Sequence, residues 1–245
     1  MKKPETIEQR WDILYREYPE VYDEFANVPY SKNDIDIIEK LFKLKGKIVA
    51  DIGAGSGVST FQLAKYARQV VGIEPERSLI DIAEKVLKEK EFHNVFFKEG
   101  WAHTIPLQDN SVDITISITG AFFHDANYIR KFVEEATRIT KSGGFIITLG
   151  TAPFWYGGEL ASVILGKTRK TDLDPEGVAD DVLTNLGFSN KDFYSVADYG
   201  TVDRAIKTYG FIFGRKAIDY LKQHQKTTIK WKYRIHYQQV KKQIS

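Results

Sequence analysis

The sequence predicts an α/β protein with a doubly wound, mostly parallel sheet of seven strands. First, the apolar run of residues 48–52 enters a turn with glycines at alternate positions, and a helical pattern follows. Second, strand and helix patterns alternate five times, as in parallel sheets covered on both faces. Third, Gly53, Glu74, Trp101 and Thr119 all fall at the ends of predicted strands, where open parallel sheets bind ligands.

The predicted elements follow in chain order. Helical spacing runs from Thr6 to Leu44, where Ser31 and Asn33 are candidate caps of the last helix. Apolar β-type runs predict strands over about 47–52, 69–74, 95–99, 112–118, 145–149, 191–196 and 229–237. Helical patterns predict helices over about 57–67, from Pro75 onward, through Ile129 to Ile139, and over 175–186, 201–208 and 215–223. The segment 153–174 is expected to be irregular, and Lys141–Gly144 is expected to form the turn before the fifth strand.

The composition excludes several classes of function. The 35 Lys and Arg nearly balance the 33 Asp and Glu, so no overall field attracts nucleic acid or an anionic membrane. No apolar run approaches a membrane span and no signal peptide follows Met1, so a cytoplasmic location is expected. The absence of cysteine excludes disulfides, thiolate metal sites and a cysteine nucleophile.

The turn after residue 52 indicates a binding site for a nucleotide-like cofactor. Gly53, Gly55 and Gly57 tolerate positive φ and allow a ligand close to the backbone, and the following helix begins with unpaired N–H groups. The dinucleotide fingerprint would require a glycine where Val58 stands. The spacing therefore differs from that of NAD-binding turns.

With Asp51 two residues upstream, this turn resembles the first motif of class I S-adenosylmethionine-dependent methyltransferases, and residues 48–149 resemble the small-molecule, methyltransferase type 11-like branch. The resemblance implies a Rossmann-like methyltransferase fold, S-adenosyl-L-methionine as cofactor and S-adenosyl-L-homocysteine as product. One domain is expected over 1–245, with an N-terminal helical lid (1–46), a cofactor-binding core (47–150), and a substrate insert with the C-terminal strands (151–245).

The resemblance also implies a role for individual residues. Gly53 to Gly57 would run beside the methionine part of the cofactor with Asp51 near its amino group, and Glu74 would accept the ribose hydroxyls. In the adenine loop, Gly100–Leu107, the family usually has an acid where this chain has Trp101; Trp101 would stack on the ring while the Ala102 N–H reads its edge. The implied cofactor-binding residues are Asp51, Gly53, Ala54, Gly55, Gly57, Glu74, Pro75, Trp101, Ala102, Ser117 and Thr119.

Methyl transfer by such a site depends mainly on holding the acceptor in line, so no catalytic side chain is strictly required. If the acceptor is a hydroxyl or a protonated amine, a general base helps, and His124 is the candidate. Aromatic residues before and after the core predict a pocket for a small apolar or aromatic acceptor. They are Tyr15, Tyr18, Tyr22, Phe25, Tyr30, Phe154, Trp155, Tyr156, Tyr209, Phe211 and Phe213.

Other functions remain open at the level of sequence. From Tyr220 onward, basic residues interleave with Trp231, Tyr233 and Tyr237, which could serve a methyltransferase acting on tRNA, rRNA or protein. The strict alternation over 229–237 favours a half-buried strand instead, and nucleic acid is not the favoured partner. A non-catalytic S-adenosylmethionine-binding module on the same fold is the other alternative. Asp172, Asp174, Asp180 and Asp181 are expected to form a solvated acidic loop rather than a metal site, and oligomeric state is left open.

Overall fold

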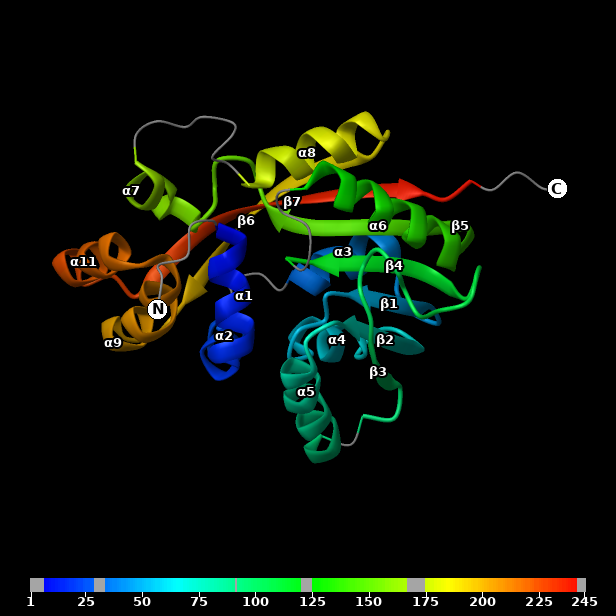
Figure 1. The fold of residues 1–245 in the computed structure, drawn as a ribbon, viewed down its shortest axis with the longest axis horizontal. Coiled ribbons are helices and arrows are strands. Elements are labelled where there is room, and N and C mark those ends of the chain that lie inside the picture. Colours follow the sequence, from blue (N-terminus) through cyan, green and yellow to red (C-terminus); the bar gives the residue numbers. More distant parts are fainter. Residues whose placement is uncertain (1–6, 29–33, 91, 120–124, 167–174, 242–245) are drawn as a thin grey trace.

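In the computed structural model, seven strands form one sheet in the order β3-β2-β1-β4-β5-β7-β6 (Figure 1). The structure describes residues 7–28, 34–90, 92–119, 125–166 and 175–241. Strands β1 to β5 run parallel, whereas β7 runs antiparallel to both β5 and β6. The predicted fold class is therefore confirmed. The strands are β1 (Ile48–Ile52), β2 (Gln69–Glu74), β3 (Val95–Glu99), β4 (Val112–Ile118), β5 (Thr140–Thr151), β6 (Ser189–Asp198) and β7 (Thr228–Gln239).

Helices cover both faces of this sheet. Successive residues of a strand point to opposite faces, so Val49 and Val70 join one apolar cluster while Ala50 and Val71 join the other. The first cluster contains side chains of α3 (Asp34–Phe42), α4 (Val58–Leu63) and α5 (Arg77–Glu89). The second contains side chains of α6 (Ala126–Ile139) and α8 (Pro175–Asn185), which lie side by side (Figure 1).

The remaining helices gather beyond the carboxyl ends of the parallel strands (Figure 1). Two come from the N-terminal segment, α1 (Ile7–Glu17) and α2 (Pro19–Ala26). The others follow β5 and β6, namely η1 (Gly158–Leu160), α7 (Ala161–Leu165), α9 (Val202–Ala205), η3 (Ile206–Gly210), α10 (Phe211–Phe213) and α11 (Arg215–His224). The N-terminal segment and the segments after the core thus meet at the edge of the sheet where ligands are expected.

Two of the expected boundaries are wrong around the parallel strands. Helix α4 ends at Leu63 rather than near Ala67, because the Arg68 N–H already bonds to the Lys47 carbonyl and draws the chain into the sheet. Lys141–Gly144 does not form a turn before β5, because the strand begins at Thr140, directly after α6. Lys141 is anchored to Asp113 at 2.8 Å, and the pairing of β4 with β5 shifts register between Val112 and Ile114. This segment is therefore an irregular start of the strand itself.

The segment after β5 is more helical than expected, since η1 and α7 lie within the span expected to be irregular. The helix expected over 201–208 instead continues to Phe213, and its middle, η3, is a π-helix. A π-helical turn widens the helix, and such turns are frequent at functional sites. Here the widened turn buries Tyr209, whose hydroxyl donates to the Gly157 carbonyl at 2.5 Å. No helix among the described residues combines the length and apolar character needed to cross a bilayer.

The apolar core under α6 generates a stability prediction. Phe132 of α6 is fully buried, whereas Phe96 of β3 is half exposed. We expect Phe132→Ala to lower the free energy of unfolding by about 3–5 kcal/mol, because it removes buried apolar surface and leaves a cavity. Phe96→Ala is the matched control and is expected to cost less than about 1 kcal/mol. Urea unfolding followed by tryptophan fluorescence measures both, and equal losses would contradict the assignment of the core.

Candidate functional site

The loop between β1 and α4 turns through three glycines in the left-handed region. Gly53, Gly55 and Gly57 have φ values of +76°, +56° and +87°. A Cβ on Gly57 would lie 2.7 Å from the ring of Phe61 and 2.9 Å from that of Phe97, so no larger residue fits there without displacing the rings. The N–H groups of Gly53 and Ala54 both donate to the Ile73 carbonyl, at 2.8 and 3.1 Å. The loop is thereby held against the end of β2.

Asp51, the acid before this loop, is fully buried at the end of β1. Its Oδ2 accepts hydrogen bonds from the hydroxyls of Ser59 and Thr60, both at 2.7 Å. Its Oδ1 is buried and has no hydrogen-bond partner in the described part of the chain. Burial raises the pKa of the Asp51 carboxyl, and the bonds from Thr60 and Ser59 act in the opposite direction. An unsatisfied buried carboxylate oxygen is costly, so this position fits a ligand that supplies a donor.

Glu74 ends β2 beside the glycine loop and is almost fully buried. Its Oε2 accepts the Gly55 N–H at 2.8 Å, and its Oε1 accepts the Glu76 N–H at 3.0 Å. Burial raises the pKa of Glu74 to about 7, although these two backbone bonds favour the charged form. Each carboxylate oxygen has a second acceptor position, so Glu74 can still accept hydroxyl donors.

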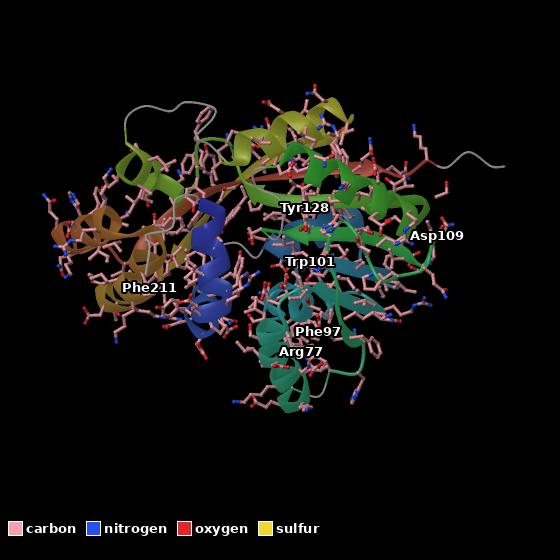
Figure 2. All side chains as sticks on the ribbon, viewed as in Figure 1. Arg77, Phe97, Trp101, Asp109, Tyr128 and Phe211 are labelled. Atoms are coloured by element: carbon pink, nitrogen blue, oxygen red, sulfur yellow. The ribbon has the colours of Figure 1, made fainter. Side chains whose placement is uncertain are left out.

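The loop after β3 brings aromatic rings to the same edge (Figure 2). The Gly100 N–H bonds to the Glu74 carbonyl, and Trp101 next to it is half exposed. The Trp101 and His103 rings lie 5.9 Å apart, and the His103 ring lies 5.1 Å from that of Tyr128. Trp101 therefore has an accessible face for stacking. The Ala102 backbone lies near the phenol of Tyr128: burial raises the pKa of Tyr128, and the Ala102 backbone acts in the opposite direction.

A cavity of about 420 Å³ opens next to the glycine loop at the ends of β1 and β4. Its walls include Gly53, Ala54 and Thr119, three of the residues expected at the site. Thr119 has φ +49°, which is uncommon for a β-branched residue, and its N–H bonds to the Leu149 carbonyl at 2.7 Å. Eight aromatic residues line the rest, namely Trp11, Tyr15, Tyr22, Phe25, Tyr156, Phe213, Trp231 and Tyr233.

The N-terminal helices line this cavity and contact both the glycine loop and the segment after β2. The Ser56 hydroxyl donates to Asp23 of α2 at 2.5 Å. Arg16 of α1 pairs with Glu76 at 3.1 Å, just after the end of β2. The ring of Tyr22 lies so close to Gly55 that a Cβ there would be 3.2 Å from it. The described part of the N-terminal segment therefore forms a wall of the cavity.

Several expected residues do not line the cavity. Ser117 is buried and donates to the Ile52 carbonyl at 2.8 Å, so its hydroxyl joins two strands. Pro75 is partly buried after Glu74 but does not line the cavity. Among the aromatic candidates, Tyr18 and Phe211 are exposed and contact each other at 5.2 Å, while Trp155 packs on Tyr194. The remaining candidates, Phe154 and Tyr209, do not line the cavity either. His124, Tyr30, Ser31, Asn33, Asp172 and Asp174 lie outside the described residues.

The residues that suggested RNA binding are engaged in the fold. Trp231 and Tyr233 of β7 are buried, as strand alternation predicts. Lys232 pairs with Asp192 at 2.6 Å, and Arg234 pairs with both Asp192 and Asp180 at 2.6 Å. Asp180, expected to be solvated, also accepts from His236 at 2.9 Å. These side chains connect α8, β6 and β7.

Sequence reasoning missed some residues of the site. Asp34, the first residue of α3, lines the cavity, and so do Trp231 and Thr151. Ser59 and Thr60 hold Asp51, and their place in the first turn after the glycine loop is a signal that could have identified them. No comparable signal marked Asp34, because it is more than a dozen residues before β1 in the chain.

Comparisons with known proteins agree with this geometry. Residues 50–148 match the model of the Methyltransf_11 family, described as a methyltransferase domain. The uncharacterized methyltransferase YcgJ of Bacillus subtilis is 32% identical over 106 residues, 43% of this chain and 41% of YcgJ. A demethylmenaquinone methyltransferase of a Geobacillus strain is 24% identical over 153 residues, 61% of this chain and 64% of that protein. The chain spans about half the length of the curated relatives it matches.

Solved structures share the fold. The crystal structure of YcgJ superposes with a TM-score of 0.62 at 18% identity, covering 85% of this chain and 98% of YcgJ. The structure of the [4+2]-cyclase SpnF superposes with a TM-score of 0.61 at 18% identity, covering 98% of both chains. At such identity these matches establish the architecture, and a cyclase on it shows that the architecture alone does not fix the chemistry.

The buried carboxyl of Glu74 predicts a pH dependence of stability. Because folding raises its pKa from 4.5 to about 7, its contribution is fully present below about pH 4.5 and is lost as the pH rises through 7. We expect the free energy of unfolding of the wild type, relative to Glu74→Gln, to fall by up to roughly 3 kcal/mol across this range. Urea unfolding at a series of pH values measures the difference.

Glu99→Gln is the matched control, because Glu99 lies beside Glu74 in the β2–β3 register and is exposed. Its difference from the wild type should stay constant over the same pH range. If the free energies of unfolding of the wild type and Glu74→Gln change in parallel with pH, the buried carboxyl does not titrate as expected.

Proposed function

Residues 50–148 form a methyltransferase domain of class I, the S-adenosylmethionine-dependent type, and from this premise we propose that the chain transfers a methyl group to a small molecule bound in the aromatic cavity. The single observation that carries the proposal is the adjacency of two sites. A nucleotide-type cradle of buried carboxylates and left-handed glycines lies at the ends of β1 and β2, and the cavity opens from its loop at Gly53 and Ala54.

The residues of the cradle fit S-adenosylmethionine. The unpartnered Oδ1 of buried Asp51 suits the ammonium of its methionine part. Glu74 retains acceptor positions for the two ribose hydroxyls, while Trp101 offers an exposed ring to the adenine. When bound, this cofactor supplies a methyl group already activated on a sulfonium.

The chain's own residues then act mainly by positioning and by excluding water. The Ser56–Asp23 contact fastens α2 to the glycine loop, and the Arg16–Glu76 pair fastens α1 to the segment after β2. Aromatic rings of both the N-terminal helices and the insert surround the space beside Thr119. Alignment of two reactants in one site contributes about 7–11 kcal/mol where the geometry is good.

A small apolar or aromatic acceptor suits this cavity best. Its volume of about 420 Å³ is within the range of small-molecule pockets, and eight of its 23 lining residues are aromatic. The similarity to a demethylmenaquinone methyltransferase, whose name denotes a small-molecule substrate, supports the same class. The RNA alternative has less support because Trp231, Tyr233 and Arg234 are committed to packing and ion pairs.

Calorimetry and a methylation assay test this proposal. The wild type should bind S-adenosylhomocysteine with one site per chain and NAD not measurably, and it should transfer labelled methyl groups into the small-molecule fraction of a cell extract. Binding of NAD alone would refute the proposal. Binding of S-adenosylhomocysteine with no methylation of small molecules, RNA or protein would identify a non-catalytic cofactor-binding module instead.

A substitution at Asp51 gives a sharper prediction. Asp51→Asn should weaken S-adenosylhomocysteine binding by about tenfold or more, because a neutral amide replaces the carboxylate that fits the ammonium. Asp81→Asn is the matched control, since Asp81 is an exposed acid on α5 paired with Arg77. Isothermal titration calorimetry measures both, and unchanged affinity for Asp51→Asn would remove this residue from the cofactor site.

A further inference from the structure

The aromatic cavity contains one partly buried carboxyl group that the proposed methyl transfer does not use. Asp34 begins α3 and lines the same cavity as Ile35, Gly53 and Ala54. It is the only Asp or Glu among the described lining residues, and no Lys, Arg or His is among them. The net charge that the described walls present to a ligand therefore comes from this side chain.

The Asp34 carboxyl lacks a partner in the described part of the chain. Its Oδ1 is buried and has no hydrogen-bond partner among the described residues, while the residue as a whole is partly exposed. Burial raises the pKa of Asp34 to about 7, and it is the only cause of the shift. A buried carboxyl without a donor costs free energy that a ligand can recover by supplying one.

The other walls attract the same kind of ligand. The faces of Trp and Tyr rings attract cations, and Trp11, Tyr15, Tyr22 and Trp231 all line the cavity. Some polar atoms of these rings are already used, since Trp11 Nε1 donates to the Tyr156 hydroxyl at 3.0 Å. Aromatic rings around an unpaired carboxylate form a site that suits an apolar molecule with a positively charged end.

We propose that the acceptor pocket selects an amine, with Asp34 accepting N–H bonds from its ammonium group and the aromatic rings holding its apolar body. This inference rests on the proposed function and names the substrate class of the same cavity. A neutral hydrocarbon would leave Asp34 buried and unsatisfied, and a carboxylate or phosphate would be repelled by it. A protonated amine can both donate N–H bonds to the carboxylate and be attracted to the faces of the aromatic rings.

Binding of matched probes tests this inference without measuring methyl transfer. Phenethylamine and 2-phenylethanol share their apolar body and differ at the polar end, and Trp11 and Trp231 in the cavity wall report binding by fluorescence. With S-adenosylhomocysteine present, the wild type should bind the amine at least about tenfold more tightly than the alcohol. Asp34→Asn should remove most of this preference and leave the affinity for the alcohol within about twofold.

Asp36→Asn is the matched control on the same helix, because Asp36 is exposed and accepts from the Tyr66 hydroxyl instead of lining the cavity. It should keep the preference for the amine. The comparison of amine and alcohol affinities in the wild type needs no variant, so it tests the inference even if Asp34→Asn folds poorly.

Three results would overturn the inference. In the first, the wild type binds arylalkylamines no more tightly than the matched alcohols. In the second, Asp34→Asn loses affinity for both probes equally. In the third, Asp34→Asn loses affinity for S-adenosylmethionine but not for S-adenosylhomocysteine, which would assign Asp34 to the sulfonium. Failure of the proposed function is separate, because it appears as a wild type that does not bind S-adenosylhomocysteine at all.

Discussion

The hydrogen bond from the Gly55 N–H to Glu74 Oε2 is the contact on which the site depends. It joins the turn after β1 to the end of β2, and the bonds of Gly53 and Ala54 to the Ile73 carbonyl fasten the same two elements. The turn can make these bonds only with three residues at positive φ, which glycine adopts at least cost. Two buried carboxylates and a bare stretch of backbone thereby share one edge of the sheet.

The cavity is a consequence of where the turn lies. Ser56 and Glu76, which flank the cradle, hold α2 and α1 through Asp23 and Arg16. The insert closes the other side, where the π-helical turn of η3 directs Phe213 toward Tyr156 and Trp231. Segments that are distant in sequence therefore complete a single enclosure, and its chemistry combines aromatic faces with the unpaired Asp34. The proposed methyl transfer requires both parts, a cradle for the cofactor and a separate pocket for the acceptor.

The core of the fold was predictable because its signals are local. Strands β1, β2 and β4 are short runs rich in β-branched residues, and α6 shows its buried stripe through Ile129, Phe132 and Ala136. The errors arose where the sheet overrides local preference. Gly143 and Gly144 read as a turn, yet the Lys141–Asp113 pair and the shifted register extend β5 through them. Helix α4 likewise stops early because the Arg68 N–H pairs with Lys47 of the chain entering β1.

The sequence by itself determined the cradle, since Asp51, the glycines and Glu74 lie at the ends of adjacent strands and need only the parallel register to meet. The tertiary structure alone decided the aromatic cavity. Its walls come from α1, α2, α3, the insert and β7, and no local pattern states which of their aromatic rings pack in the core and which face a cavity. Asp34 looked like any acid at a helix start, and only the packing around it buried its Oδ1 without a hydrogen-bond partner among the described residues. Burial depends on contacts between distant segments, so it is a property of the fold rather than of any stretch of chain.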